Sequence, residues 1–223
     1  MGDGMRVGGL ATLLMLAVGS GCGFGAQGDL QATLAKLDAA SARFTNAEAK
    51  VHRDAYTKFV DEHAGSDGTM YLSRDASGKV QFGLSISGKD ARTIDYKGGT
   101  VRAFNPGIGC YDSVDKAGID TYVTLGFGGS GKDLAEKWNI TDLGPDTING
   151  TKVEKLDLVP KDADVKKNVS KVSLWVDTDR DVSLKQVFFM PNNDTNTATY
   201  TNIRLNQKAI GMKPYEIKGK PCK

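Results

Sequence analysis

Apolar and polar residues alternate with a period of two along most of this chain. From Val80 to Ile86, every even-numbered residue is apolar and every odd-numbered residue is small or polar. Successive side chains of a β-strand point to opposite faces, so this pattern predicts strands with one apolar face. The same period marks further segments, at residues 47–59, 69–74, 94–96, 100–104, 156–158, 172–176, 182–190 and 196–206.

Short turn motifs separate these predicted strands. Gly98-Gly99 and Asn149-Gly150 are typical of two-residue hairpin turns, and we also expect turns at residues 65–68 and 177–181. Consecutive hairpins make one large antiparallel sheet, and a sheet of about ten or eleven strands has to curl. We therefore predict a mainly β fold.

Two regions follow a helical pattern instead. Apolar residues fall on one side of a helix between about residues 30 and 42. Residues 119–139 predict two short helices on either side of a glycine-rich loop at 126–131. These helices could cover one open face of the curled sheet.

The glycine-rich loop also matches a phosphate-binding pattern. Gly126 to Lys132 reads GxxxxGK, which in nucleotide-binding proteins cradles phosphates with backbone N–H groups. However, Asp133 stands where that motif needs a serine or threonine, and the chain lacks regular alternation of strands and helices. We interpret the loop as a flexible connection between two helices.

Charge and residue content exclude several functions. The net charge is +2, from 29 basic and 27 acidic residues, so no basic surface for nucleic acid is indicated. There are two histidines, and neither lies at metal-ligand spacing or beside a nucleophile motif. Residues 177–181 resemble the start of a calcium loop, but the later ligand positions do not match. We expect no catalytic residue, no metal and no cofactor, and hence no enzyme.

The first 26 residues read as a secretory signal peptide. Arg6 precedes the apolar run from Leu10 to Val18, and small residues follow as far as Ala26. A membrane span needs roughly 20 apolar residues, about twice the length of this run. We expect residues 1–26 to be removed and residues 27–223 to form one periplasmic domain.

Cys22 leaves a second processing route open. Bacterial lipoprotein signals resemble small residues before a lipidated cysteine, and Gly19-Ser20-Gly21-Cys22 has the small residues. Gly19 occupies the position where that signal has an aliphatic residue, which favours cleavage into a soluble form. If Cys22 carries a lipid, the chain is tethered to a membrane.

Two cysteines remain if Cys22 leaves with the signal. A pair of cysteines in an exported protein suggests one disulfide, here between Cys110 and Cys222. The alternative is two separate buried thiols. Neither cysteine belongs to a CxxC motif, so metal binding and thioredoxin-like chemistry are not indicated.

An ordered series of motifs points to a known family. The carboxyl half contains residues 156–161, then 172–177 with Leu174-Trp175-Val176-Asp177, then 184–187 and 199–206. This series resembles the LolA-like periplasmic carriers of outer-membrane lipoproteins, and residues 71–74 and 97–106 look like the family's corresponding amino-terminal strands. The likeness covers about residues 29–206.

The resemblance implies both a fold and a function. The fold would be an incomplete, strongly curved antiparallel β-barrel of about 11 strands, covered by a lid of short helices. Its hollow would accept acyl chains of a lipid or lipoprotein, received from an inner-membrane transporter and passed to an outer-membrane acceptor. A LolA-fold module that binds lipid or senses envelope stress, without trafficking, is the alternative.

Site residues follow from the alternation and from the resemblance together. Arg74 matches a family arginine that holds the lid to the barrel. The residues expected to line the acyl cavity are apolar and lie on the predicted strands: Phe82, Leu84, Ile86, Ile94, Tyr96, Leu174 and Val176.

Overall fold

The computed structural model describes residues 25–75, 77–89, 91–115 and 120–222. Cys22 and residues 1–24 of the expected signal peptide lie outside the described residues. Among the described residues, no helix is long and apolar enough to cross a membrane.

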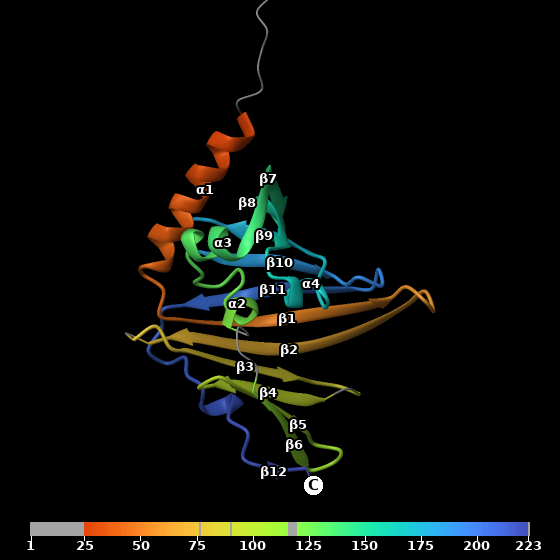
Figure 1. Cartoon of the computed structure of the whole chain (residues 1–223). Coiled ribbons are helices and arrows are strands. Elements are labelled where there is room, and N and C mark those ends of the chain that lie inside the picture. Colours follow the sequence, from red (N-terminus) through yellow and green to blue (C-terminus); the bar gives the residue numbers. More distant parts are fainter. Residues whose placement is uncertain (1–24, 76, 90, 116–119, 223) are drawn as a thin grey trace, which may run out of the picture.

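Twelve strands of the described ranges form one open, curved sheet (Figure 1). The spatial order is β12-β6-β5-β4-β3-β2-β1-β11-β10-β9-β8-β7, so β12 and β7 are the edges. Strand β12 pairs in parallel with β6, and the other described pairs are antiparallel. The strands are β1 Asn46–Thr57, β2 Glu62–Arg74, β3 Val80–Ile86, β4 Arg92–Lys97, β5 Thr100–Asn105, β6 Cys110–Asp115, β7 Trp138–Ile148, β8 Thr151–Pro160, β9 Lys171–Asp177, β10 Val182–Phe189, β11 Thr195–Leu205 and β12 Lys220–Pro221.

In the part of the chain that the structure describes, four α-helices and one 3₁₀ turn accompany the sheet. The predicted mainly β fold, an open curved sheet with short helices, is confirmed. Two short helices flank the glycine-rich loop as expected. The helices are α1 Gly25–Ser41, α2 Asp120–Val123, α3 Gly131–Lys137 and α4 Ala163–Lys166, with a 3₁₀ turn, η1, at Lys213–Tyr215.

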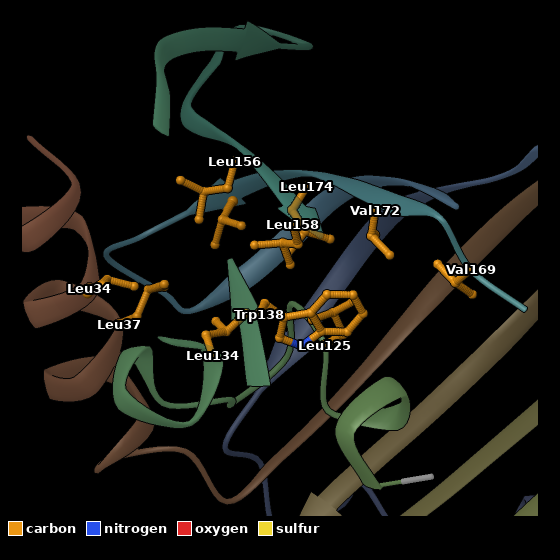
Figure 2. Packing of buried hydrophobic residues seen from close by; sticks show 11 residues of the cluster. Leu34, Leu37, Leu125, Leu134, Trp138, Leu156, Leu158, Val169, Val172 and Leu174 are labelled. Carbon is orange, nitrogen blue, oxygen red and sulfur yellow. The ribbon is translucent and has the colours of Figure 1, made fainter. Parts of the chain in front are cut away.

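Helices α1 and α3 cover one end of the sheet and form its main core. Figure 2 shows Leu34 and Leu37 of α1 and Leu134 of α3 beside side chains of β8 and β9. Aliphatic side chains on one face of a strand need such a partner layer to leave water. The cluster's fully buried members have an exposed fraction of 0%: Leu156, Leu158, Val172 and Leu174.

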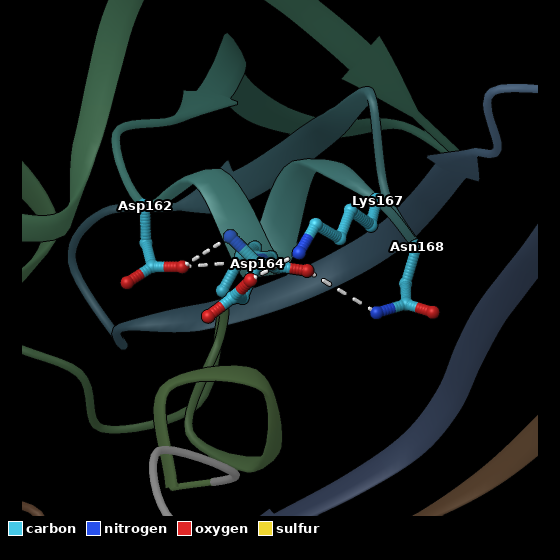
Figure 3. A network of polar contacts seen from close by, with 5 residues as sticks. Asp162, Asp164, Lys167 and Asn168 are labelled. Atoms are coloured by element: carbon cyan, nitrogen blue, oxygen red, sulfur yellow. Dashed lines mark hydrogen bonds and ion pairs between the residues drawn. The ribbon is translucent and has the colours of Figure 1, made fainter.

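Helix α4 closes the connection between β8 and β9 and was not predicted. The Asp162 carboxylate accepts hydrogen bonds from the backbone N–H groups of Asp164 and Val165, at 2.7 and 3.0 Å. Figure 3 also shows the Lys167 ammonium 2.6 Å from Asp164, and Asn168 donating to the Asp164 carbonyl. All of these groups are on the surface, so the network is a helix cap and not a ligand site.

The turn predicted at residues 65–68 is wrong. These residues lie inside β2, where Gly68 pairs with Val51, and the chain turns at residues 58–61 instead. A Cβ added at Gly68 would lie 2.3 Å from the carbonyl oxygen of Ser85, so this glycine permits close packing of β2 on β3. Phe59, predicted on the dry face of β1, sits at the hairpin tip and is 95% exposed.

The predicted helical segment at 119–139 also ends earlier than expected. Helix α3 stops at Lys137, and Trp138 begins β7 by pairing with Pro160 of β8. Residues 116–119 lie outside the described residues.

The carboxyl-terminal segment forms a strap on the face opposite the helices. Figure 1 shows it, in blue, running from the end of β11 to β12. Ile210, Met212 and Tyr215 pack on Tyr71 of β2. A Cβ added at Gly83 would lie 2.3 Å from Tyr215, so the missing side chain makes room for the strap.

A disulfide fastens the end of this strap. Cys110 at the start of β6 is bonded to Cys222, the pairing that the sequence predicted, with an S–S distance of 1.96 Å. The backbone N–H of Ile217 donates to the buried Asp95 carboxylate at 3.1 Å. The strap therefore shields β2–β4 from water on their outer face.

Candidate functional site

The face of the sheet that carries α1, α2 and α3 is called the inner face. Direct cross-strand partners point to the same side of a sheet. Leu84 of β3 pairs with Met70 of β2 and with Ile94 of β4, and Phe82 pairs with Tyr96. A second core cluster joins Phe82 and Leu84 to Val123 of α2 and to Phe127, which assigns this set to the inner face.

The inner face is divided into a covered half and an accessible half. Over β8 and β9 its aliphatic side chains Leu156, Leu158, Val172 and Leu174 are fully buried beneath α1 and α3. Over β3–β5 it stays partly exposed, at Phe82, Leu84, Ile94, Val101 and Ala103. We call these five side chains the apolar strip. A strip of accessible apolar surface beside a packed core is typical of a ligand-binding face.

The predicted cavity residues divide between these halves. Phe82, Leu84 and Ile94 belong to the apolar strip, and Ile86 and Tyr96 are buried beside it. Leu174 and Val176 lie in the core under the helices, away from the strip.

Arg74 connects the helices to the sheet. Its guanidinium donates to the Ser41 hydroxyl at the end of α1, at 3.2 Å, and that hydroxyl donates to the Gly128 carbonyl at 2.8 Å. The Gly128 N–H in turn donates to the Asp181 carbonyl, at 3.2 Å. This chain of hydrogen bonds joins α1, the glycine-rich loop and the β9–β10 turn, at the position that the sequence assigned to a lid contact.

Asp181 is a buried carboxyl group that sequence reasoning missed. It is 1% exposed, and its Oδ2 has no hydrogen-bond partner among the described residues. Burial raises the pKa of Asp181 to about 8; the charge of Arg74 opposes this effect and that of Asp38 adds to it. The nearest sequence signal was its place in a turn, where it adopts a φ of 53°.

The glycine-rich loop packs tightly against its surroundings. A Cβ at Gly128 would lie 2.4 Å from the Phe44 ring, and one at Gly131 would lie 2.3 Å from the Leu34 carbonyl oxygen. Ser130 caps α3 by accepting from the Asp133 N–H at 3.0 Å. Close packing on Phe44, which follows α1, and on Leu34 of α1 therefore accounts for glycine at the two positions.

A polar seam crosses the inner face between the two halves. Gln186 donates to the Leu125 carbonyl at 2.6 Å, and Tyr200 donates to the Gln186 amide oxygen at 3.2 Å. The Tyr200 ring meets Phe127 edge-on, with centroids 4.8 Å apart. Burial raises the pKa of Tyr200, against the opposing charge of Arg53.

Other polar clusters lie away from the apolar strip. His52 is 2.8 Å from Asp67 and His63 is 2.8 Å from Asp54, and all four residues project from the outer face of the β1–β2 hairpin. Within the described ranges, no group of three or more His, Cys, Asp or Glu residues could hold a metal ion.

Comparisons with known proteins relate this architecture to solved structures. No family model matches the chain, and no curated protein matches it. The crystal structure of MucB matches with a TM-score of 0.55 and 13% identity, covering 87% of this chain and 65% of that chain. The Pseudomonas aeruginosa MucA/MucB complex matches with a TM-score of 0.53 and 14% identity, covering 87% and 63%.

Two further structures extend the likeness. An uncharacterized conserved protein from Thermus thermophilus has a TM-score of 0.55 at 8% identity, covering 87% of this chain and 98% of that chain. A LolA superfamily protein, NE2245 from Nitrosomonas europaea, also matches, with a TM-score of 0.42, 12% identity and coverage of 84% and 97%.

The fold is LolA-like. An open curved sheet beneath short helices is the architecture that the sequence motifs implied, and MucB matches it with a TM-score of 0.55. At identities of 8–14% the likeness concerns the fold alone. The chain also spans less than two thirds of the MucB structures that it matches.

Proposed function

We propose that this LolA-like module binds acyl chains of a lipid or lipoprotein on the inner face of β3–β5 and carries them through the periplasm. One observation carries the proposal. The apolar strip stays accessible, whereas the inner face over β8–β9 is sealed by helices and the outer face of β2–β4 is covered by the strap.

The energetics suit a carrier that must also release its cargo. Burying an acyl chain gains about 0.8 kcal/mol per methylene group, so a 16-carbon chain that buries half its methylenes gains roughly 6 kcal/mol, equivalent to a Kd of tens of micromolar. A partly open strip shelters part of a chain and leaves a route for its exit. Arg74, which contacts the end of α1, pairs with Val80, two residues before Phe82 of the strip.

A fluorescent fatty-acid probe tests the proposal. Leu84→Glu places a charge on the apolar strip, and we expect it to abolish probe binding. Gln81→Glu is the matched control, because it adds the same charge to the opposite face of β3. Thermal melting of both variants checks that each is folded. Wild-type protein that binds no acyl probe, and that copurifies with no lipid or lipoprotein, would contradict the proposal.

The periplasmic location and the trafficking partners belong to the same proposal. Their support is the signal-peptide pattern of residues 1–26 and the resemblance of the sequence motifs to the LolA-like carriers. We propose that an inner-membrane transporter supplies the cargo and that an outer-membrane acceptor receives it. Crosslinking in the intact envelope, followed by mass spectrometry, would identify both.

The match to MucB favours a second candidate function. MucB has been solved in complex with MucA, and those structures cover 87–88% of this chain. The module would then bind a protein partner and sense envelope stress, without a trafficking role. Mass spectrometry of native complexes separates the two: acylated cargo favours the carrier, and a partner protein recovered without lipid favours the sensor.

A further inference from the structure

A cationic side chain interrupts the apolar pattern on the inner face. Arg53 lies two residues after Val51 in β1, so both project from the same side of the sheet. Val51 is buried, and its cross-strand partner Tyr200 packs on Phe127 of the glycine-rich loop. Arg53 therefore lies on the inner face and not in open solvent.

The guanidinium of Arg53 has no counterion among the described residues. No hydrogen bond or ion pair joins its side chain to another described residue, and the nearby carboxylates Asp54 and Asp67 pair with histidines on the outer face. Burial is the largest of the effects that lower the pKa of Arg53. Arginine cannot discharge by losing a proton, so its charge stays partly buried and uncompensated.

A second arginine lies on the same face. Arg92 is the first residue of β4. It stands in one cross-strand row with Ile86 of β3, Gly68 of β2 and Val51 of β1. Cross-strand pairing along this row directs Arg92 to the inner face as well. Its positive charge contributes to lowering the pKa of Arg53, so the two guanidinium groups act on each other.

These cations border the apolar strip. Ile86 lies in the same strand as Leu84 and Phe82, so a ligand chain on the strip ends close to the arginines. The guanidinium fork matches carboxylate and phosphate groups with two parallel hydrogen bonds. Apolar surface that leads to a pair of cations is complementary to an amphiphile with a negative head.

We propose that Arg53 binds the anionic head group, a carboxylate or a phosphate, of the acyl ligand that the apolar strip holds, and that the positive charge of Arg92 nearby strengthens this binding. This inference rests on the proposed acyl binding and names the ligand class. The arginines supply the preference for a charged ligand, and the strip supplies the binding of its chain.

Three probes with one acyl chain length test the inference: a fluorescent fatty acid, its methyl ester and the corresponding lysophosphatidic acid. We expect the wild-type protein to bind at least one anionic probe roughly tenfold more tightly than the ester, as a charge-assisted hydrogen bond would give. The tighter of the two anionic probes identifies the head group as carboxylate or phosphate.

Variants assign the preference to the arginines. Arg53→Gln should weaken anionic binding to the level of the ester and leave ester binding unchanged, whereas Arg53→Lys should keep part of the preference. Lys220→Gln is the control, because it removes one positive charge from the exposed edge strand β12. Arg92 is exposed, so Arg92→Gln serves as a second test if Arg53→Gln does not fold.

The outcomes separate this inference from the proposed function. Equal affinity of the wild-type protein for ester and anionic probes would overturn the anion site and leave acyl binding in place. Failure of all three probes would overturn both. An anionic preference that survives both Arg53→Gln and Arg92→Gln would also refute the assignment.

Discussion

Replacing Asp181 with asparagine should change how the stability of the protein depends on pH. The carboxyl group is buried, its Oδ2 has no partner among the described residues, and its pKa is raised to about 8 in the folded state. Asparagine has nearly the same shape and tolerates the positive φ of 53° at this turn position. The substitution therefore removes the ionisation and keeps the backbone.

The sign and size follow from proton linkage. Between the ordinary aspartate pKa of about 4 and the folded value of about 8, the folded protein holds a proton that the unfolded chain has released. Rising pH therefore destabilises the fold throughout that window, by up to about 1.4 kcal/mol per pH unit. From pH 5 to pH 7 the loss is about 2.7 kcal/mol. Above about pH 8 this contribution no longer changes.

Thermal melting at pH 5 and pH 7 measures this loss. Asp181→Asn should resemble the wild type at pH 5 and melt roughly 5–10 °C higher at pH 7, given about 2–4 °C per kcal/mol for a domain of this size. Asp179→Asn is the control, because Asp179 is an exposed carboxylate in the same turn. Arg74 and Asp38 are the charges that act on Asp181, and both are unchanged in the two variants.

Two results would refute this reasoning. One is an Asp181→Asn variant whose melting temperature differs from that of the wild type by the same amount at both pH values. The other is a variant that is less stable than the wild type at pH 7, which would mean that ionised Asp181 has a stabilising partner.

Two further predictions concern the carboxyl-terminal strap. Replacing Cys110 and Cys222 with alanine should lower the free energy of unfolding by about 2–4 kcal/mol, because the bridge closes a loop of 112 residues; denaturant melts with and without reductant measure this, and an unchanged midpoint would contradict it. Gly83→Val should dislodge Tyr215 of the strap from β3 and speed proteolysis after β11, whereas Gly65→Val, whose Cβ position has no neighbour closer than 3.7 Å, should leave proteolysis of the strap unchanged. Equal cleavage rates for the two glycine variants would contradict the second prediction.

Local patterns in the sequence determined most of the elements. The period of two over residues 80–86 predicted β3, and Gly98-Gly99 and Asn149-Gly150 predicted the hairpins between β4 and β5 and between β7 and β8. These signals succeed because side-chain alternation and turn geometry involve only neighbouring residues. The family motifs added the curved sheet and its helices.

Contacts between distant segments decided the rest. Glycines at 65 and 68 resemble a turn, yet Gly68 lies within β2 because Ser85 of β3 approaches it closely. Sequence alternation placed Leu174 and Phe82 alike on the apolar face of a strand. Helices α1 and α3 pack over Leu174 and bury it, whereas Phe82 lies beyond them and stays accessible.

The charged residues show the same division most clearly. Arg53 looks like one more polar residue in a strand, and Asp181 like one more aspartate in a turn. Their environments come from the glycine-rich loop, from strands distant in sequence and from the end of α1. Alternation determines which side of a strand a side chain takes. Whether that side is solvated, buried or open to a ligand depends on which distant segment packs over it. Only the tertiary structure determines which segment that is.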